Sequence, residues 1–211
     1  MNKNYIILLL LCALSGNAQF YKAKLLMTDG SIKEGFAELP SNKLLDTGVK
    51  FKTSQKSNAE NLSDDALEKI LFTTDSGNQF LFERNSVVHL FKSFGNEVEH
   101  EKLSKHWMVL FHSNKMLNGY SLAQRYKIDK NGTLISITGA YSIWEFVYFL
   151  LKRGNETKAY IVSGKGFSNG EVRKAMEIYF KDVPEFVTRV ENKEFKNSTI
   201  EHVADEYAKY F

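Results

Sequence analysis

Cysteine is almost absent from this chain of 211 residues, whose only thiol belongs to Cys12. A single cysteine cannot form a disulfide within the chain, so the fold must be held together by packing and hydrogen bonds. Cys12 lies inside an apolar stretch near the start of the sequence, where we interpret it as a hydrophobic filler. Removal of that stretch would leave no thiol, which excludes a cysteine nucleophile from the mature protein.

Proline is also scarce, and basic and acidic residues nearly balance. Only Pro40 and Pro184 occur, and this excludes long proline-rich linkers. The chain has 28 basic and 25 acidic residues, spread along the sequence without a block of one sign. The balance predicts no nucleic-acid partner, because proteins that bind nucleic acid carry basic patches that neutralise phosphates.

The sequence also lacks an apolar run long enough to span a membrane. The run from Tyr5 to Leu14 has ten residues and follows Lys3. A helix needs about 20 apolar residues to cross the hydrocarbon layer of a bilayer. A short apolar run behind a single positive charge is instead typical of a secretory signal peptide.

A cleavage site follows this run. Gly16 and Ala18 are small residues with one residue between them, as signal peptidase requires. We therefore predict a signal peptide over residues 1–18, cleaved between Ala18 and Gln19. The mature protein is then secreted or periplasmic and keeps no transmembrane anchor.

Apolar and aromatic residues are plentiful. They make up 43% and 13% of the chain, and these fractions indicate a folded globular protein. Between residues 20 and 163 the apolar residues alternate, which predicts strands over 20–28, 31–39, 49–52, 70–73, 79–83, 86–92, 105–112, 120–128, 133–139, 144–151 and 158–163. For 144–151 a helix is the alternative, and the aromatic residues favour a buried strand. Turn dipeptides such as Asp29-Gly30 and Asn131-Gly132 separate several of these strands. We predict an antiparallel sheet of hairpins, a meander, over residues 19–165.

The spacing of the apolar residues changes after residue 165. Apolar residues then recur every three or four positions, which predicts three short amphipathic helices. Each helix has a start signal, a polar residue with an acid three positions later: Ser168 with Glu171, Asp182 with Glu185, and Ser198 with Glu201. The predicted fold class is α+β, with residues 166–211 packed on the sheet.

No motif in the sequence identifies a catalytic, cofactor or metal site. His106 and His112 are six residues apart on a predicted strand, about 20 Å along it, so one metal ion cannot bind both. The stretch SGKGFSNG, which contains Lys165, precedes a helix and is a candidate anion site, but it lacks the spacing of a phosphate-binding P-loop. The alternative is a connector between sheet and helices. We predict no catalytic residue and no cofactor, although carboxylates from distant strands could still meet in a cleft.

Trp107 and Trp144 are the candidate contacts for a sugar, because aromatic faces stack on sugar rings. Each lies among apolar residues, which favours core packing. Together with Lys165 they are the only residues that we single out as possible ligand or partner contacts.

Several segments resemble uncharacterised secreted proteins of the Bacteroidota. The resemblance begins with a signal that ends in Asn-Ala-Gln at residues 17–19 and with the hairpin LMTDGSIKEGF at residues 26–36. It continues through residues 49–51, 146–154 and 174–192. It implies a bacterial envelope or exported location and a β-rich region followed by a helical tail. It implies no defined activity, so it assigns no catalytic residue.

The leading functional hypothesis is therefore a non-catalytic binding or structural protein of the periplasm or cell envelope, whose partner is an envelope protein or a glycan. Two alternatives stay open: a small hydrolase of envelope glycans or peptides, and a carrier of an apolar ligand. A hydrolase predicts a cleft with two carboxylates. A carrier predicts an apolar cavity of at least about 300 Å³, and a binding module predicts an exposed apolar patch.

Overall fold

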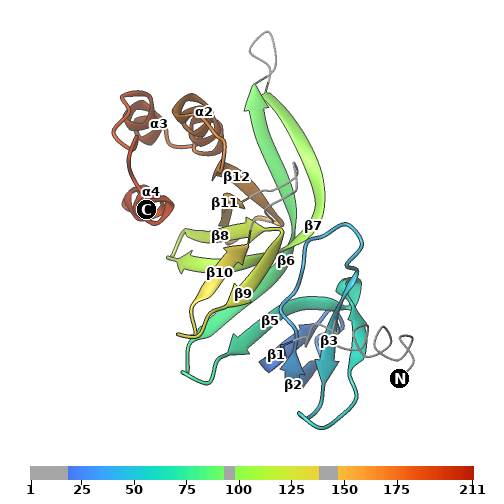
Figure 1. The fold of residues 1–211 in the computed structure, drawn as a ribbon. Helices are drawn as coiled ribbons and strands as arrows, with labels where there is room; N and C mark the ends of the chain where they lie inside the picture. The colour runs from blue at the N-terminus through green and yellow to red at the C-terminus, as the bar shows by residue number, and fades with distance from the viewer. Residues whose placement is uncertain (1–18, 93–97, 138–146) are drawn as a thin grey trace, which may run out of the picture.

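The computed structural model describes residues 19–92, 98–137 and 147–211 (Figure 1). Strands fill most of the chain up to residue 164, and three helices follow. The first five strands are β1 (Tyr21–Met27), β2 (Ile32–Ala37), β3 (Gly48–Lys52), β4 (Glu60–Ser63) and β5 (Leu67–Thr73). The others are β6 (Gln79–Lys92), β7 (Val98–Ser113), β8 (Leu117–Ala123), β9 (Arg125–Ile128), β10 (Leu134–Ile137), β11 (Val147–Arg153) and β12 (Lys158–Gly164). The α+β class is confirmed.

The predicted turns form where the turn dipeptides stand. Gly30 has a φ of 82° between β1 and β2, and Gly132 has a φ of 76° between β9 and β10. Glycine adopts such positive angles without the steric cost that a side chain would bring. Both turns connect antiparallel neighbours.

The predicted antiparallel meander is wrong in one respect, because the sheet contains a parallel pair that closes it into a barrel. β6 has 14 residues, and its two halves have different partners. The first half pairs with β5 up to Glu83, whereas the second half pairs in parallel with β12, for example Val87 with Ala159. Strands β6, β7, β8, β11 and β12 therefore form a closed ring, and β5, β1, β2, β3 and β4 extend the sheet from β6.

Two apolar cores fill the β region. The closed ring encloses Val87, Met108, Tyr120, Leu122, Leu150, Ala159 and Ile161, all buried. The second core lies under the first five strands and includes Phe72, Phe82, Trp107 and Tyr126. Long β6 and β7 contribute to both cores, and this joins the two halves of the sheet.

Three helices form at the end of the chain, namely α2 (Asn169–Tyr179), α3 (Pro184–Glu191) and α4 (Ile200–Ala208). The Ser168–Glu171 capping box is present in full at the start of α2. The other two predicted caps are wrong. Asp182 does not cap α3, because its carboxylate binds Arg153 and Tyr207 instead. Thr199 rather than Ser198 caps α4.

The helices pack their apolar faces on the outside of the barrel. One buried cluster combines strand residues such as Val88, Leu151 and Val162 with helix residues such as Phe186 and Tyr207. Figure 1 shows the three helices together beside β11 and β12, away from β1 to β5. No helix in the described part of the chain is long and apolar enough to cross a membrane.

Candidate functional site

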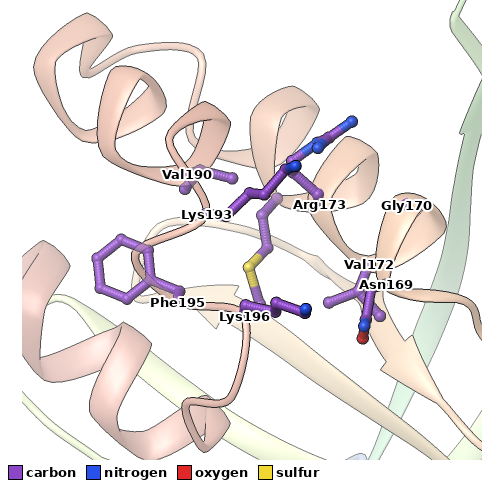
Figure 2. A pocket seen from close by; sticks show the side chains of 9 residues that line it. Asn169, Gly170, Val172, Arg173, Val190, Lys193, Phe195 and Lys196 are labelled. Carbon is purple, nitrogen blue, oxygen red and sulfur yellow. The ribbon is translucent and has the colours of Figure 1, made fainter.

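Two hollows on the surface could bind a ligand. The first, the helix pocket, has a volume of about 320 Å³ and lies between α2, α3 and the segment after α3. Figure 2 shows residues of α2 on one side and Val190, Lys193 and Phe195 on the other. The second, the polar cleft, has a volume of about 470 Å³ and lies between the β2–β3 loop, η1 (Asp64–Ala66), β6 and β7.

The floor of the helix pocket is apolar. Met176 and Val190 are each 3% exposed and Phe195 is 7% exposed, and Val172 adds a further apolar wall. These side chains belong to the core that joins the helices to the barrel. A hydrocarbon group in the pocket would therefore rest on rigid, well-packed side chains.

The rim of the helix pocket is cationic. Arg173, Lys193 and Lys196 line it, and no acidic residue does. Arg173 Nε lies 3.2 Å from Glu177 Oε1, outside the lining. Within the described ranges, neither lysine lies within ion-pair distance of a carboxylate, so both charges are available to an anion. Gly170, in the first turn of α2, also lines the pocket.

Lys193 has an uncommon backbone conformation. Its φ is 63°, in the left-handed region that favours glycine. The N–H of Lys193 donates to Val190 O at 3.0 Å and that of Glu194 donates to Arg189 O at 3.1 Å, which is the Schellman pattern at a helix end. Glycine usually occupies this position, so a lysine here costs about 1 kcal/mol of stability.

The polar cleft has a different chemistry. Its lining includes three acids, Asp46, Asp64 and Asp65, and three cations, Lys43, Arg84 and Lys105. Hydroxyl and amide groups supply most of the remaining polar surface, namely Ser41, Asn42, Thr47, Asn61, Ser63 and Ser104. Arg84 Nη1 lies 2.8 Å from Asp65 Oδ1, so part of the charge is neutralised within the cleft.

Asp64 and His106 have shifted pKa values. Burial raises the pKa of the Asp64 carboxyl, although the Trp107 indole N–H donates to its Oδ1 at 2.8 Å and favours the charged form. Burial and the nearby charge of Arg84 lower the pKa of His106, which favours the neutral imidazole. His106 Nε2 lies 3.3 Å from Ser104 Oγ.

Asp64→Asn is expected to stabilise the protein increasingly as the pH rises. The folded-state pKa of Asp64 is raised, so folding disfavours its charged form and stability falls as the pH climbs from about 3.9, the ordinary value. The amide removes this penalty and keeps an acceptor for Trp107. Urea unfolding at several pH values measures the difference between variant and wild type. A difference that shrinks as the pH rises would contradict the shift.

Of the residues singled out from the sequence, Trp107 lines the polar cleft and Lys165 lines neither hollow. Trp107 is 1% exposed, so its ring face is covered and not open to stacking on a sugar, and its indole N–H donates to Asp64 in the cleft. Lys165 is exposed after β12, where its backbone N–H donates to Val147 O at 2.9 Å, and it lines neither hollow. Gln19 is exposed. Trp144 and Ala18 lie outside the described residues.

The histidines considered as metal ligands are separated in the structure. His106 faces the polar cleft, whereas His112 Nε2 lies 2.9 Å from Asp205 Oδ1 on α4. In the described ranges, no group of three histidine, aspartate or glutamate side chains is arranged to hold a metal ion.

Lys193 of the helix pocket and Asp64 of the polar cleft were not predicted from the sequence as site residues. The Lys193 position could have been found only by locating the end of α3, and Asp64 had no local signal.

Comparisons with protein-family models, with curated proteins and with solved structures found no match to this chain.

Proposed function

We propose that this protein is a non-catalytic binding protein that works outside the inner membrane of a bacterium and takes a small amphipathic anion in the helix pocket. The observation that carries the proposal is the pairing of an apolar floor with a cationic rim, in which Lys193 keeps a conformation that favours glycine. The leader-like residues 1–18 support the location.

The size of the pocket limits the ligand. Its volume of about 320 Å³ is at the lower end for ligand sites. A medium-length acyl chain with a carboxylate fits this description. Each buried methylene contributes about 0.8 kcal/mol, and the loss of free motion on binding removes at least about 4 kcal/mol. The acyl chain alone therefore binds weakly, and the charges of Lys193 and Lys196 are needed for useful affinity.

Lys193→Gly is expected to move stability and binding in opposite directions. Glycine relieves the left-handed backbone strain, so the free energy of unfolding should rise by about 1 kcal/mol. Loss of the ammonium should weaken the binding of decanoate about tenfold in isothermal titration calorimetry.

The controls for this experiment separate charge from apolar contact. Lys174→Ala removes the same charge from exposed α2 surface outside the pocket and should leave decanoate binding unchanged. Decan-1-ol, which has no charge, should bind wild type and Lys193→Gly equally. Decanoate binding that is unaltered in Lys193→Gly would overturn the proposed ligand class.

The proposed export and cleavage of the protein can be tested separately. N-terminal sequencing of the protein recovered from the periplasm or medium should begin at Gln19. Recovery of the whole chain with Met1 from cytosolic extract would refute the exported location.

A hydrolase is the second candidate, favoured by the three carboxylates in the polar cleft. Release of reducing ends from cell-wall glycan by wild type, and its loss in Asp64→Asn, would support this alternative. The binding proposal predicts no release by either protein.

A further inference from the structure

We propose that the polar cleft is a second binding site, which takes an uncharged oligosaccharide carrying acetamido groups. The cleft is lined by the β2–β3 loop, β4, η1, β6 and β7, whereas the helix pocket lies among the C-terminal helices. The two sites share no lining residue.

The charges of the cleft favour an uncharged ligand. The three acids and three cations in its lining cancel, and Arg84 and Asp65 already form an ion pair. A cleft without net charge attracts neither anions nor cations over a distance. It offers hydrogen bonds instead, through hydroxyl, amide and carboxylate groups that match the hydroxyls of a sugar.

The cleft is held in shape before any ligand arrives. The Asn42 side chain fixes the β2–β3 loop to the barrel, because Nδ2 donates to Trp107 O and to Ala123 O, each at 2.8 Å, and Oδ1 accepts from Trp107 N–H at 2.8 Å. Figure 1 shows this loop rising from the first strands to lie beside β6 and β7. On the opposite wall, Trp107 orients the Asp64 carboxylate and the Asp64 N–H donates to Thr47 O at 3.0 Å. A site built in advance loses less entropy when a flexible ligand binds.

The rim of the cleft has an exposed apolar residue, Leu44, that does not serve the fold. Leu44 lines the cleft and is 95% exposed, and its neighbour Leu45 is 89% exposed. They lie at the centre of a turn closed by Asp46 N–H donating to Lys43 O at 3.0 Å, where polar residues and glycine are usual. Adjacent polar groups and an exposed leucine match an acetamido group, which pairs an amide with a methyl.

Titration with tri-N-acetylchitotriose, with cellotriose as the matched sugar without acetamido groups, tests this inference. The probe is Trp107 fluorescence, since its indole N–H bonds Asp64 in the cleft, and Trp144→Phe removes the other tryptophan signal. Chitotriose should change the emission in a saturable way below about 10 mM, and cellotriose should bind at least about fivefold more weakly for lack of the methyl contact.

Three variants distinguish a site from a general effect on the fold. Asp64→Asn should weaken chitotriose binding about tenfold, because a charged acceptor is lost. Leu44→Ala should weaken it about fivefold with no change in stability, since Leu44 supports no packing. Lys24→Ala, on the far exposed pair with Glu34, should change nothing. No saturable signal with chitotriose, equal binding of cellotriose, or unchanged binding in Leu44→Ala would each overturn the inference.

Discussion

Phe186→Ala is expected to lower the free energy of unfolding by about 4 kcal/mol. Phe186 is 0% exposed and lies at the centre of the helix core. Its ring centroid lies 4.8 Å from that of Phe180, 5.0 Å from that of Phe195 and 5.4 Å from that of Tyr207. Alanine would leave a cavity that rigid aromatic neighbours cannot fill. Urea unfolding followed by circular dichroism measures the loss.

Phe211→Ala is the matched control for the aromatic core. Phe211 is 58% exposed at the end of the chain, where its ring contacts Tyr207 at a centroid distance of 5.3 Å. Its removal should cost less than about 1 kcal/mol, since little apolar surface returns to water. Equal losses in the two variants would contradict the packing of the helices on the barrel.

Arg153→Ala is expected to cost about 3 kcal/mol, because it removes the cation that binds the partly buried Glu156 carboxylate and the Tyr179 carbonyl. Arg153 Nη1 lies 2.9 Å from Glu156 Oε1, and Nη2 lies 2.7 Å from Asp182 Oδ1. Nη2 also donates to Tyr179 O at 2.9 Å and to Tyr207 Oη at 3.2 Å, and the guanidinium lies 4.4 Å from the Tyr179 ring centroid. One side chain of β11 thus joins the barrel to α2, to α4 and to the turn before α3.

Two controls test whether geometry or charge carries this effect. Arg153→Lys keeps the charge but lacks the planar fork, so it should recover less than half of the loss. Lys24→Ala breaks an ion pair with Glu34 whose side chains are 52% and 69% exposed, and should cost less than about 0.5 kcal/mol. The comparison uses urea midpoints at one pH. A full rescue by lysine would show that the guanidinium geometry is unimportant.

Local features of the fold could be predicted from the sequence. The turns at Gly30 and Gly132 and the capping box of Ser168 depend on residues that are neighbours in the chain. Alternation in a strand shows which residues share a face, but it does not identify the neighbouring strand. The parallel pairing of β6 with β12, which closes the barrel, could not be predicted for that reason. The sequence also predicted two strands where β6 is continuous from Gln79 to Lys92.

Tertiary contacts overrode local signals at several positions. Asp182 has the spacing of a helix cap, but Arg153, 29 positions earlier, binds its carboxylate. The polar cleft depends on Asn42 and Trp107, which are 65 positions apart. Neither contact produces a periodic pattern in the amino-acid sequence. Lys193 could not be recognised either, because its role depends on where α3 ends and on the pocket that the helix ends enclose.

The helix pocket is tested most directly by ¹³C-methyl methionine NMR during a decanoate titration. The chain has five methionines, so the spectrum is simple, and Met176 is the one that lines the pocket. We predict that decanoate shifts the Met176 methyl resonance in a saturable way, while Met27 and Met108, buried in the two β cores, stay in place. A Met176 resonance that does not move when decanoate binds, or decanoate that does not bind at all, would contradict the account.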